Sequence, residues 1–304
     1  MKNLRGYAMI TGAACLWGAS ATLAKFLLNQ KIDTLLLVQT RAAFSCVLMG
    51  LYFAVFSRHV LRVHVRDLWR FALLGVLGLA GANFCYYFTI KESSVATAIT
   101  IQYTAPLFIM AFEIMRKEES FSAVKLIAAL LSLAGCFLTV TGFDLHVMKI
   151  TPIGLLTGIG SIFSFAFLTI YVRRMLAHYS VWTVTFYYIL FASLFWLIVY
   201  PPWNTVSQSY SAATWEALVL LAVASVLIPN LLYSGGLRYL VPTRAVITST
   251  LEPVIAIVTA AVFLSESITA VQAFGALLVI IAIIILQLKQ EKVPAESTGA
   301  DYAT

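Results

Sequence analysis

The feature that most limits the possible folds is a series of ten apolar runs, each about as long as a membrane-spanning helix. A helix needs roughly 20 apolar residues to cross the hydrocarbon core of a bilayer. The expected spans are 7–27, 34–57, 69–90, 94–115, 122–141, 151–172, 181–200, 215–237, 243–264 and 269–288. Charged residues make up only 11% of the chain, too few to cover the surface of a soluble domain. The sequence therefore predicts an all-α integral membrane protein.

The basic residues predict how the chain is oriented. Cytoplasmic loops of membrane proteins carry an excess of Lys and Arg. With the N-terminus in the cytoplasm, the outer side holds only Lys25, Lys31, Lys91 and Lys149, and nearly all other basic residues fall on the cytoplasmic side. An odd number of spans would remove this bias. We therefore expect ten spans with both termini in the cytoplasm, and the net charge of +7 needs no nucleic-acid partner.

A repeat of 147 positions runs through the chain. This shift places Pro106 on Pro253 and Asn83 on Asn230, so each half carries a proline-broken helix at the same place. Because each half holds five spans, the second half must enter the membrane from the opposite side. Two inverted five-helix repeats are a recurrent plan of secondary transporters. The expected units are a first repeat over 1–146, a second over 147–289 and a polar C-terminal tail over 290–304.

The same residues carry a resemblance to a known family. The run from Tyr233 to Val254, with Glu252-Pro253 near its end, and the motif Leu16-Trp17-Gly18-Ala19-Ser20 resemble the EamA repeat of the drug/metabolite transporter superfamily. The resemblance covers about residues 7–288. It implies ten helices in an inverted repeat, a bacterial inner (plasma) membrane, and transport of small metabolites through a central cavity. The first repeat departs from the pattern, because Ala105 stands where its Glu would lie.

Polar and aromatic residues inside the spans are candidates for lining a substrate site. Side chains of these types suit an amphipathic organic solute when they face a cavity. Packing between helices and aromatic belts at the membrane interface are the alternative explanations. The candidate substrate-binding residues are Trp17, Asn83, Tyr86, Tyr87, Gln102, Tyr103, Phe163, Tyr171, Asn230, Tyr233, Ser249 and Glu252.

Glu252 and the two prolines are the most distinctive of the polar and helix-breaking residues. An ionised carboxylate in the middle of a span must face the protein interior or be protonated. Glu252 could contact a substrate ammonium group, carry a proton, or make a structural hydrogen bond. Pro106 and Pro253 each free a backbone carbonyl, which is tolerated at membrane depth only beside water, protein or a polar ligand. We expect both prolines to act as hinges, with plain kinking as the alternative.

Two other charged positions have open roles. Arg41, inside the second span, could capture a substrate carboxylate or extend its charge toward the membrane surface. Glu113 is expected to pair with Arg116 or Lys117 near the end of the fourth span. A set of arginines spaced by four is expected to form one stripe on a helix, at positions 58, 62, 66 and 70.

These features favour a secondary transporter that moves a small organic metabolite by alternating access. An amino acid or a related amphipathic compound is the expected substrate, and export is the expected direction. The alternative is an importer of a vitamin, sugar or nucleotide-linked solute on the same fold. The sequence has no ATPase motif, metal-ligand cluster or intramembrane nucleophile, so we expect neither an enzyme nor a cofactor. The expected partners are the small-molecule substrate and membrane lipid, and the oligomeric state is left open.

Overall fold

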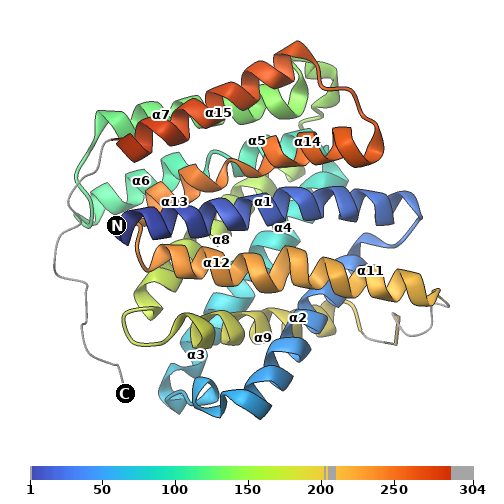
Figure 1. Cartoon of the computed structure of the whole chain (residues 1–304), viewed down its shortest axis with the longest axis vertical. Helices are drawn as coiled ribbons and strands as arrows, with labels where there is room; N and C mark the ends of the chain where they lie inside the picture. The colour runs from blue at the N-terminus through green and yellow to red at the C-terminus, as the bar shows by residue number, and fades with distance from the viewer. Residues whose placement is uncertain (1, 202, 205–209, 289–304) are drawn as a thin grey trace.

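The computed structural model describes residues 2–201, 203–204 and 210–288, and these are almost entirely helical (Figure 1). Ten of the described helical segments are long and apolar enough to cross a membrane. They coincide with the ten expected spans, with ends shifted by a few residues. The expected polar tail over 290–304 lies outside the described residues.

The first five spans are built from the following helices. They are α1 (Lys2–Asn29), α2 (Thr34–Phe56), the continuous series α3 (Leu68–Leu73), η3 (Leu74–Ala80) and α4 (Gly81–Glu92), the pair α5 (Val95–Gln102) and α6 (Ala105–Met115), and α7 (Ala123–Thr141). The short helices η1 (Arg58–Leu61) and η2 (Val65–Asp67) connect α2 to α3.

The last five spans follow the same plan. They are α8 (Pro152–Met175), α9 (Val181–Val199), the series α11 (Ala212–Ala222), η5 (Val223–Leu227) and α12 (Ile228–Leu237), the pair α13 (Pro242–Ser249) and α14 (Glu252–Leu264), and α15 (Ala270–Leu288). The short helix η4 (Leu145–Val147) lies between the two sets of spans.

The shift of 147 positions relates the helix boundaries as well as the residues. It carries the bounds of α5 onto those of α13, and the bounds of α7 onto those of α15. The third span and its equivalent in the second half, the eighth span, also contain a π-helical segment, η3 and η5 respectively. The fourth and ninth spans are interrupted at equivalent places, directly before Ala105 and Glu252. This pattern is consistent with two inverted five-helix repeats.

Equivalent helices of the two halves pack in reciprocal pairs. Helix α7 lies against α15 along one edge of the molecule, and α2 lies against α9 (Figure 1). Between these edges, α1 packs on α12 just as α8 packs on α4. This arrangement is consistent with a twofold relation between the halves, and the broken spans lie beside α1 and α8 in the centre.

Helices α7 and α15 approach so closely that their backbones touch. A Cβ atom on Gly135 would lie 2.7 Å from the carbonyl oxygen of Gly275, and one on Gly275 would lie 2.6 Å from the backbone nitrogen of Thr139. Lipid tails are as apolar as leucine side chains, so close packing of small residues drives such contacts in membranes.

We therefore expect Gly135→Ala to lower the free energy of unfolding by about 1–3 kcal/mol, because the added methyl group meets backbone atoms that cannot move aside. The matched control is Gly50→Ala, whose methyl group would lie at an ordinary 3.5 Å from the ring of Phe186. Thermal unfolding of the two purified variants in detergent compares them. Equal melting temperatures would contradict the close contact.

The expected helical stripe of arginines was wrong. Arg58 lies in η1, Arg66 in η2 and Arg70 in α3, while Arg62 between them has an extended backbone. The segment between the second and third spans is therefore a series of short turns rather than a continuation of either helix. The spacing of four misled because this segment makes no regular α-helix.

Candidate functional site

The ninth span is interrupted at its middle, and Glu252 is the first residue of the helix that follows the break. Helix α13 ends at Ser249 and α14 begins at Glu252, with Pro253 in the first turn. Proline suits this position, because the first backbone N–H groups of a helix have no partner within it. The positive end of the helix dipole favours a negative charge there. The sequence Glu-Pro thus places a carboxylate about 15 Å from the first residue of the span and about 18 Å from the last.

Four side chains gather around Glu252. The phenol of Tyr103, which lies in the break between α5 and α6, is directed at the carboxylate and interacts with it. Arg41 from α2 and Tyr86 from α4 interact with it electrostatically. The ring of Tyr87 lies 5.5 Å from that of Tyr86, and the guanidinium of Arg41 lies 5.6 Å from the Tyr87 centroid. These five residues are named the central cluster.

The central cluster joins the two broken spans of the protein. Tyr103 comes from the break in the first repeat and Glu252 from the break in the second. All five side chains keep part of their surface accessible, although they lie well inside their spans. The cluster is therefore not sealed into the packed core. It combines a carboxylate, a guanidinium and three phenols, which is an arrangement that can bind both charged ends of a small amphipathic molecule.

The first span holds the backbone of Glu252 in place. A Cβ atom on Gly18 would lie 2.5 Å from the carbonyl oxygen of Glu252, so only glycine allows this contact between α1 and α14. The neighbouring Trp17 donates from Nε1 to the carbonyl oxygen of Ser225 (3.0 Å), and its ring lies 5.3 Å from that of Tyr233. Trp17 is partly exposed and anchors α1 to the π-helical segment η5.

The two repeat-related asparagines stabilise the π-helical segments. A π-helical turn interrupts the regular α-helical ladder. Asn83 Nδ2 donates to the carbonyl oxygen of Leu79 (2.8 Å), and Asn230 Nδ2 donates to that of Val226 (2.7 Å). The Oδ1 atom of Asn83 accepts a hydrogen bond from Arg41 in the second span, and that of Asn230 accepts one from Tyr188 in the seventh span. Both residues therefore have a structural role in this structure, and Asn83 also connects to the central cluster.

Several other candidates make contacts with residues outside the central cluster. Tyr233 is buried and its hydroxyl lies 2.9 Å from that of Thr169, while the Ser249 hydroxyl donates to the carbonyl oxygen of Val246 (2.8 Å). Tyr171 stacks on Phe167 with ring centroids 4.7 Å apart. These contacts account for their side chains within the fold.

Phe163 and Gln102 occupy two different environments. Phe163 is 53% exposed and lies on one face of α8 with the exposed Leu156 and Ile159, and its ring packs edge-on against that of Phe108 with centroids 4.6 Å apart. The Gln102 Oε1 atom is buried and has no hydrogen-bond partner among the described residues. Gln102 lies at the end of α5, next to Tyr103, so it stays a candidate neighbour of the central cluster.

The end of α6 and the starts of α7 and α13 lie at the end of the molecule that holds the N-terminus (Figure 1). A second group of charged side chains is buried on and between these elements. Lys125 Nζ lies 2.5 Å from Glu119 Oε1, with side chains only 3% and 8% exposed. Glu113 accepts hydrogen bonds from the hydroxyl (2.5 Å) and the backbone nitrogen (3.3 Å) of Thr243. Arg244 donates to the hydroxyl of Tyr7 (3.2 Å). Glu113, Glu119, Lys125, Thr243 and Arg244 are named the buried ionic cluster.

Sequence reasoning missed this cluster. The expected pairing of Glu113 with Arg116 or Lys117 was wrong, because both basic side chains are exposed and Glu113 instead faces α13. The repeat offers one signal: the position equivalent to Glu113 is Ala260, and the position equivalent to Lys125 is Gln272. Glu113 and Lys125 therefore have no charged counterpart in the second repeat, whereas Glu119 corresponds to Glu266.

The opposite end is bridged differently. Lys25 Nζ lies 2.5 Å from Glu266 Oε1, but these side chains are 51% and 45% exposed. This ion pair connects the end of α1 to the segment between α14 and α15. The end that holds the buried ionic cluster also carries an exposed ion pair between Arg174 and Glu118 (2.7 Å), whereas the ion pair described at the other end, Lys25–Glu266, is exposed.

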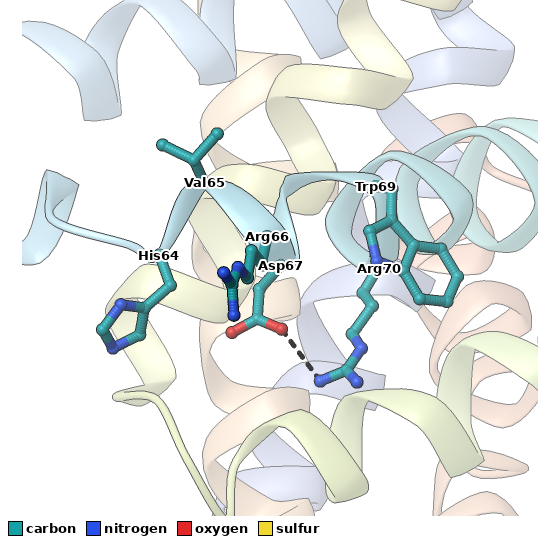
Figure 2. Close-up of a pocket in the computed structure, with 6 residues that line it drawn as sticks. All are labelled: His64, Val65, Arg66, Asp67, Trp69 and Arg70. Carbon is teal, nitrogen blue, oxygen red and sulfur yellow. Dashed lines mark hydrogen bonds and ion pairs between the residues drawn. The ribbon is translucent and has the colours of Figure 1, made fainter.

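An open depression of about 760 Å³ lies on the surface, away from both clusters. Figure 2 shows its lining, which is formed by His64, Val65, Arg66, Asp67, Trp69 and Arg70, with an ion pair of 2.8 Å between Arg70 and Asp67. Tyr179 donates to the second oxygen of Asp67 (2.5 Å), and burial together with this hydrogen bond raises the pKa of the Tyr179 phenol. These contacts tie the turns before α3 to the loop after α8, so the depression is a surface feature of the connecting segments.

Ten spans, two opposed broken helices and a charged cluster at the breaks define an integral membrane protein of the transporter class. The comparisons with known proteins give the family. The EamA-like transporter family matches residues 4–141 and 152–288, and the chain belongs to this family. It is a multi-pass inner-membrane protein.

Similar proteins extend over most of the chain. It is 25% identical to YicL of Salmonella typhimurium, described as an uncharacterized inner membrane transporter, over 95% of this chain and 97% of that protein. The threonine/homoserine exporter RhtA of Salmonella typhimurium is 30% identical over 64% of this chain and 63% of its own length. A solved crystal structure, 20% identical, matches with a TM-score of 0.73 over 94% of this chain and 97% of that chain, which shows a shared fold.

Proposed function

We propose that this protein is a secondary transporter that exports an amino acid or a related amphipathic metabolite by alternating access. Membership of a transporter family and partial similarity to a threonine/homoserine exporter support this function. The observation that carries the proposal is the central cluster, in which Glu252, Arg41 and three tyrosines meet at the breaks of both repeats.

In this proposal the cluster residues have separate tasks. Glu252 contacts the substrate ammonium group, and Tyr86, Tyr87 and Tyr103 flank the rest of the molecule. Trp17 and Gln102 complete the surroundings. Pro106 and Pro253 begin the second half of each broken span, and they serve as hinges when the repeats 1–146 and 147–289 move relative to each other.

The proposed orientation has both termini in the cytoplasm, as the distribution of basic residues indicates. The buried ionic cluster then closes the cytoplasmic side, and the Lys25–Glu266 ion pair lies at the outer side. Alternating access requires the buried ionic cluster to separate when substrate enters from the cytoplasm. The energy for transport comes from the substrate gradient or from protons.

Flux into proteoliposomes tests the function. The purified protein is reconstituted, a mixture of amino acids and other metabolites is supplied outside, and the lumen is analysed by mass spectrometry with and without an imposed proton gradient. We expect amino acids to enter faster than in protein-free liposomes. Accumulation above the outside concentration that collapses with the gradient indicates proton coupling. Entry of sugars, vitamins or nucleotides without any amino acid would contradict the proposal.

A further inference from the structure

We propose that Arg41 is an anion subsite that binds the carboxylate of an amino-acid substrate whose ammonium group lies at Glu252. This inference rests on the proposed function and adds the residue that recognises the substrate carboxylate. It follows from a difference between the two repeats at a single position.

Arg41 and Tyr188 occupy the same place in the two repeats, 147 positions apart. Arg41 Nη2 donates to Asn83 Oδ1 (2.9 Å), and the Tyr188 hydroxyl donates to Asn230 Oδ1 (3.0 Å). A neutral phenol therefore makes this contact in the second repeat, where Tyr188 is 1% exposed. The contact with the asparagine does not explain why the first repeat carries a positive charge.

The charge of Arg41 is only partly compensated by the protein. A charged side chain inside a span is costly unless it pairs with another group. Within the part of the chain that the structure describes, no carboxylate forms a direct ion pair with Arg41, and Glu252 acts on it only at longer range. A guanidinium has five N–H donors, and Asn83 accepts from one of its nitrogens. Arg41 is therefore equipped to bind an anionic group.

The surroundings of Arg41 hold the guanidinium in a fixed place. The Tyr87 ring lies against one side at 5.6 Å, and the amide of Asn83 fixes one nitrogen. Arg41 and Asn83 also line a pocket of about 10 Å³, together with Ala192 and Trp196 of α9, which has room for about one water-sized group. Asn83 and Tyr87 are thus positioning residues for Arg41, and this gives the repeat-related Asn83 a second task.

The depths of the two charges fit a zwitterion. Counted along their helices, Arg41 lies about 10 Å and Glu252 about 18 Å from the same end of the molecule. An α-amino acid that makes one hydrogen bond through each charged end spans about 8 Å. A substrate placed between the two charges lies beside the tyrosines of the central cluster. A compound that has the ammonium group but no carboxylate would leave the Arg41 subsite unused.

The test compares amino acids with their amides, which keep the ammonium group and lack the carboxylate. Full-length protein in proteoliposomes receives both sets, with threonine and threoninamide as the first pair, and lumen contents are measured by mass spectrometry. We expect the unmodified protein to prefer the amino acid. Arg41→Tyr should reduce flux of the amino acid roughly 10- to 100-fold more than flux of the amide, so that the preference is lost. Arg41→Lys should retain the preference.

The outcomes separate the subsite from the general function. Full retention of the preference in Arg41→Tyr overturns the subsite and leaves amino-acid transport standing. Absence of flux for every amino acid and amide with the unmodified protein rejects the proposed function and the subsite together. If Arg41→Tyr does not fold, Arg41→Gln replaces it. If neither neutral variant folds while Arg41→Lys folds, the charge is structural and the subsite is rejected.

Discussion

Replacing Glu252 with glutamine is expected to reduce amino-acid flux at least about 30-fold while the protein remains folded. Removing one partner of a buried charge pair costs about 2 kcal/mol or more, and in the variant the substrate ammonium group would lose its carboxylate. The amide keeps the shape of the side chain and can still accept a hydrogen bond from Tyr103. Initial rates of flux into proteoliposomes measure the effect.

The matched control for this variant is Glu266→Gln. Glu266 follows the same helix, but it is half-exposed and lies at the end of the span. The flux of the Glu266→Gln variant should therefore remain close to that of the unmodified protein. If Glu252 also carries a coupling proton, Glu252→Gln should lose the pH dependence of flux that the unmodified protein shows. Equal flux in Glu252→Gln and Glu266→Gln would show that the carboxylate has only a structural role.

Lys125→Met is expected to lower the free energy of unfolding by about 3–5 kcal/mol. The substitution leaves Glu119 in a buried position without its positive partner, and removal of one member of a buried ion pair is strongly destabilising. The measurement is denaturant-induced unfolding in detergent, followed by tryptophan fluorescence. The matched control is Lys25→Met, because the Lys25–Glu266 pair has the same N–O distance but is half-exposed, and such pairs contribute about 0–1 kcal/mol.

A double variant separates the lost charge pair from lost packing. Lys125→Met combined with Glu119→Gln removes both charges, so it should recover much of the stability that Lys125→Met loses. The single substitution Glu119→Gln completes the double-mutant cycle, which measures the coupling between the two side chains. A Lys125→Met variant as stable as Lys25→Met would show that the buried ionic cluster does not hold this end of the protein together.

The fold was largely predictable from the sequence because the membrane allows few solutions. Every backbone polar group inside a bilayer must be satisfied within the protein, so each apolar run of sufficient length had to be a helix. The breaks in the fourth and ninth spans were also predictable. Pro106 and Pro253 cannot continue a helix without losing a hydrogen bond, and the repeat placed the two breaks at equivalent positions.

The site was only partly predictable, because the faces of the helices were not. Hydropathy separates a core face from a solvent face, but lipid is as apolar as a protein core. Phe163 and Tyr103 were therefore equal candidates in the sequence, although one faces outward and the other lies at Glu252. The partner of Glu113 could not be predicted from the sequence for a different reason. Thr243 lies 130 positions further along the chain, and no local pattern links the two residues.

The unequal closure of the two ends has a consequence for the response of the protein to ionic strength. Dissolved ions screen the exposed Lys25–Glu266 pair and hardly reach the Lys125–Glu119 pair. In the proposed orientation, salt in the outer medium weakens the Lys25–Glu266 contact, whereas salt in the cytoplasm weakens the exposed Arg174–Glu118 pair but leaves the buried Lys125–Glu119 pair intact. The proposed alternating-access equilibrium would therefore respond more to the electrolyte outside the membrane than to that in the cytoplasm.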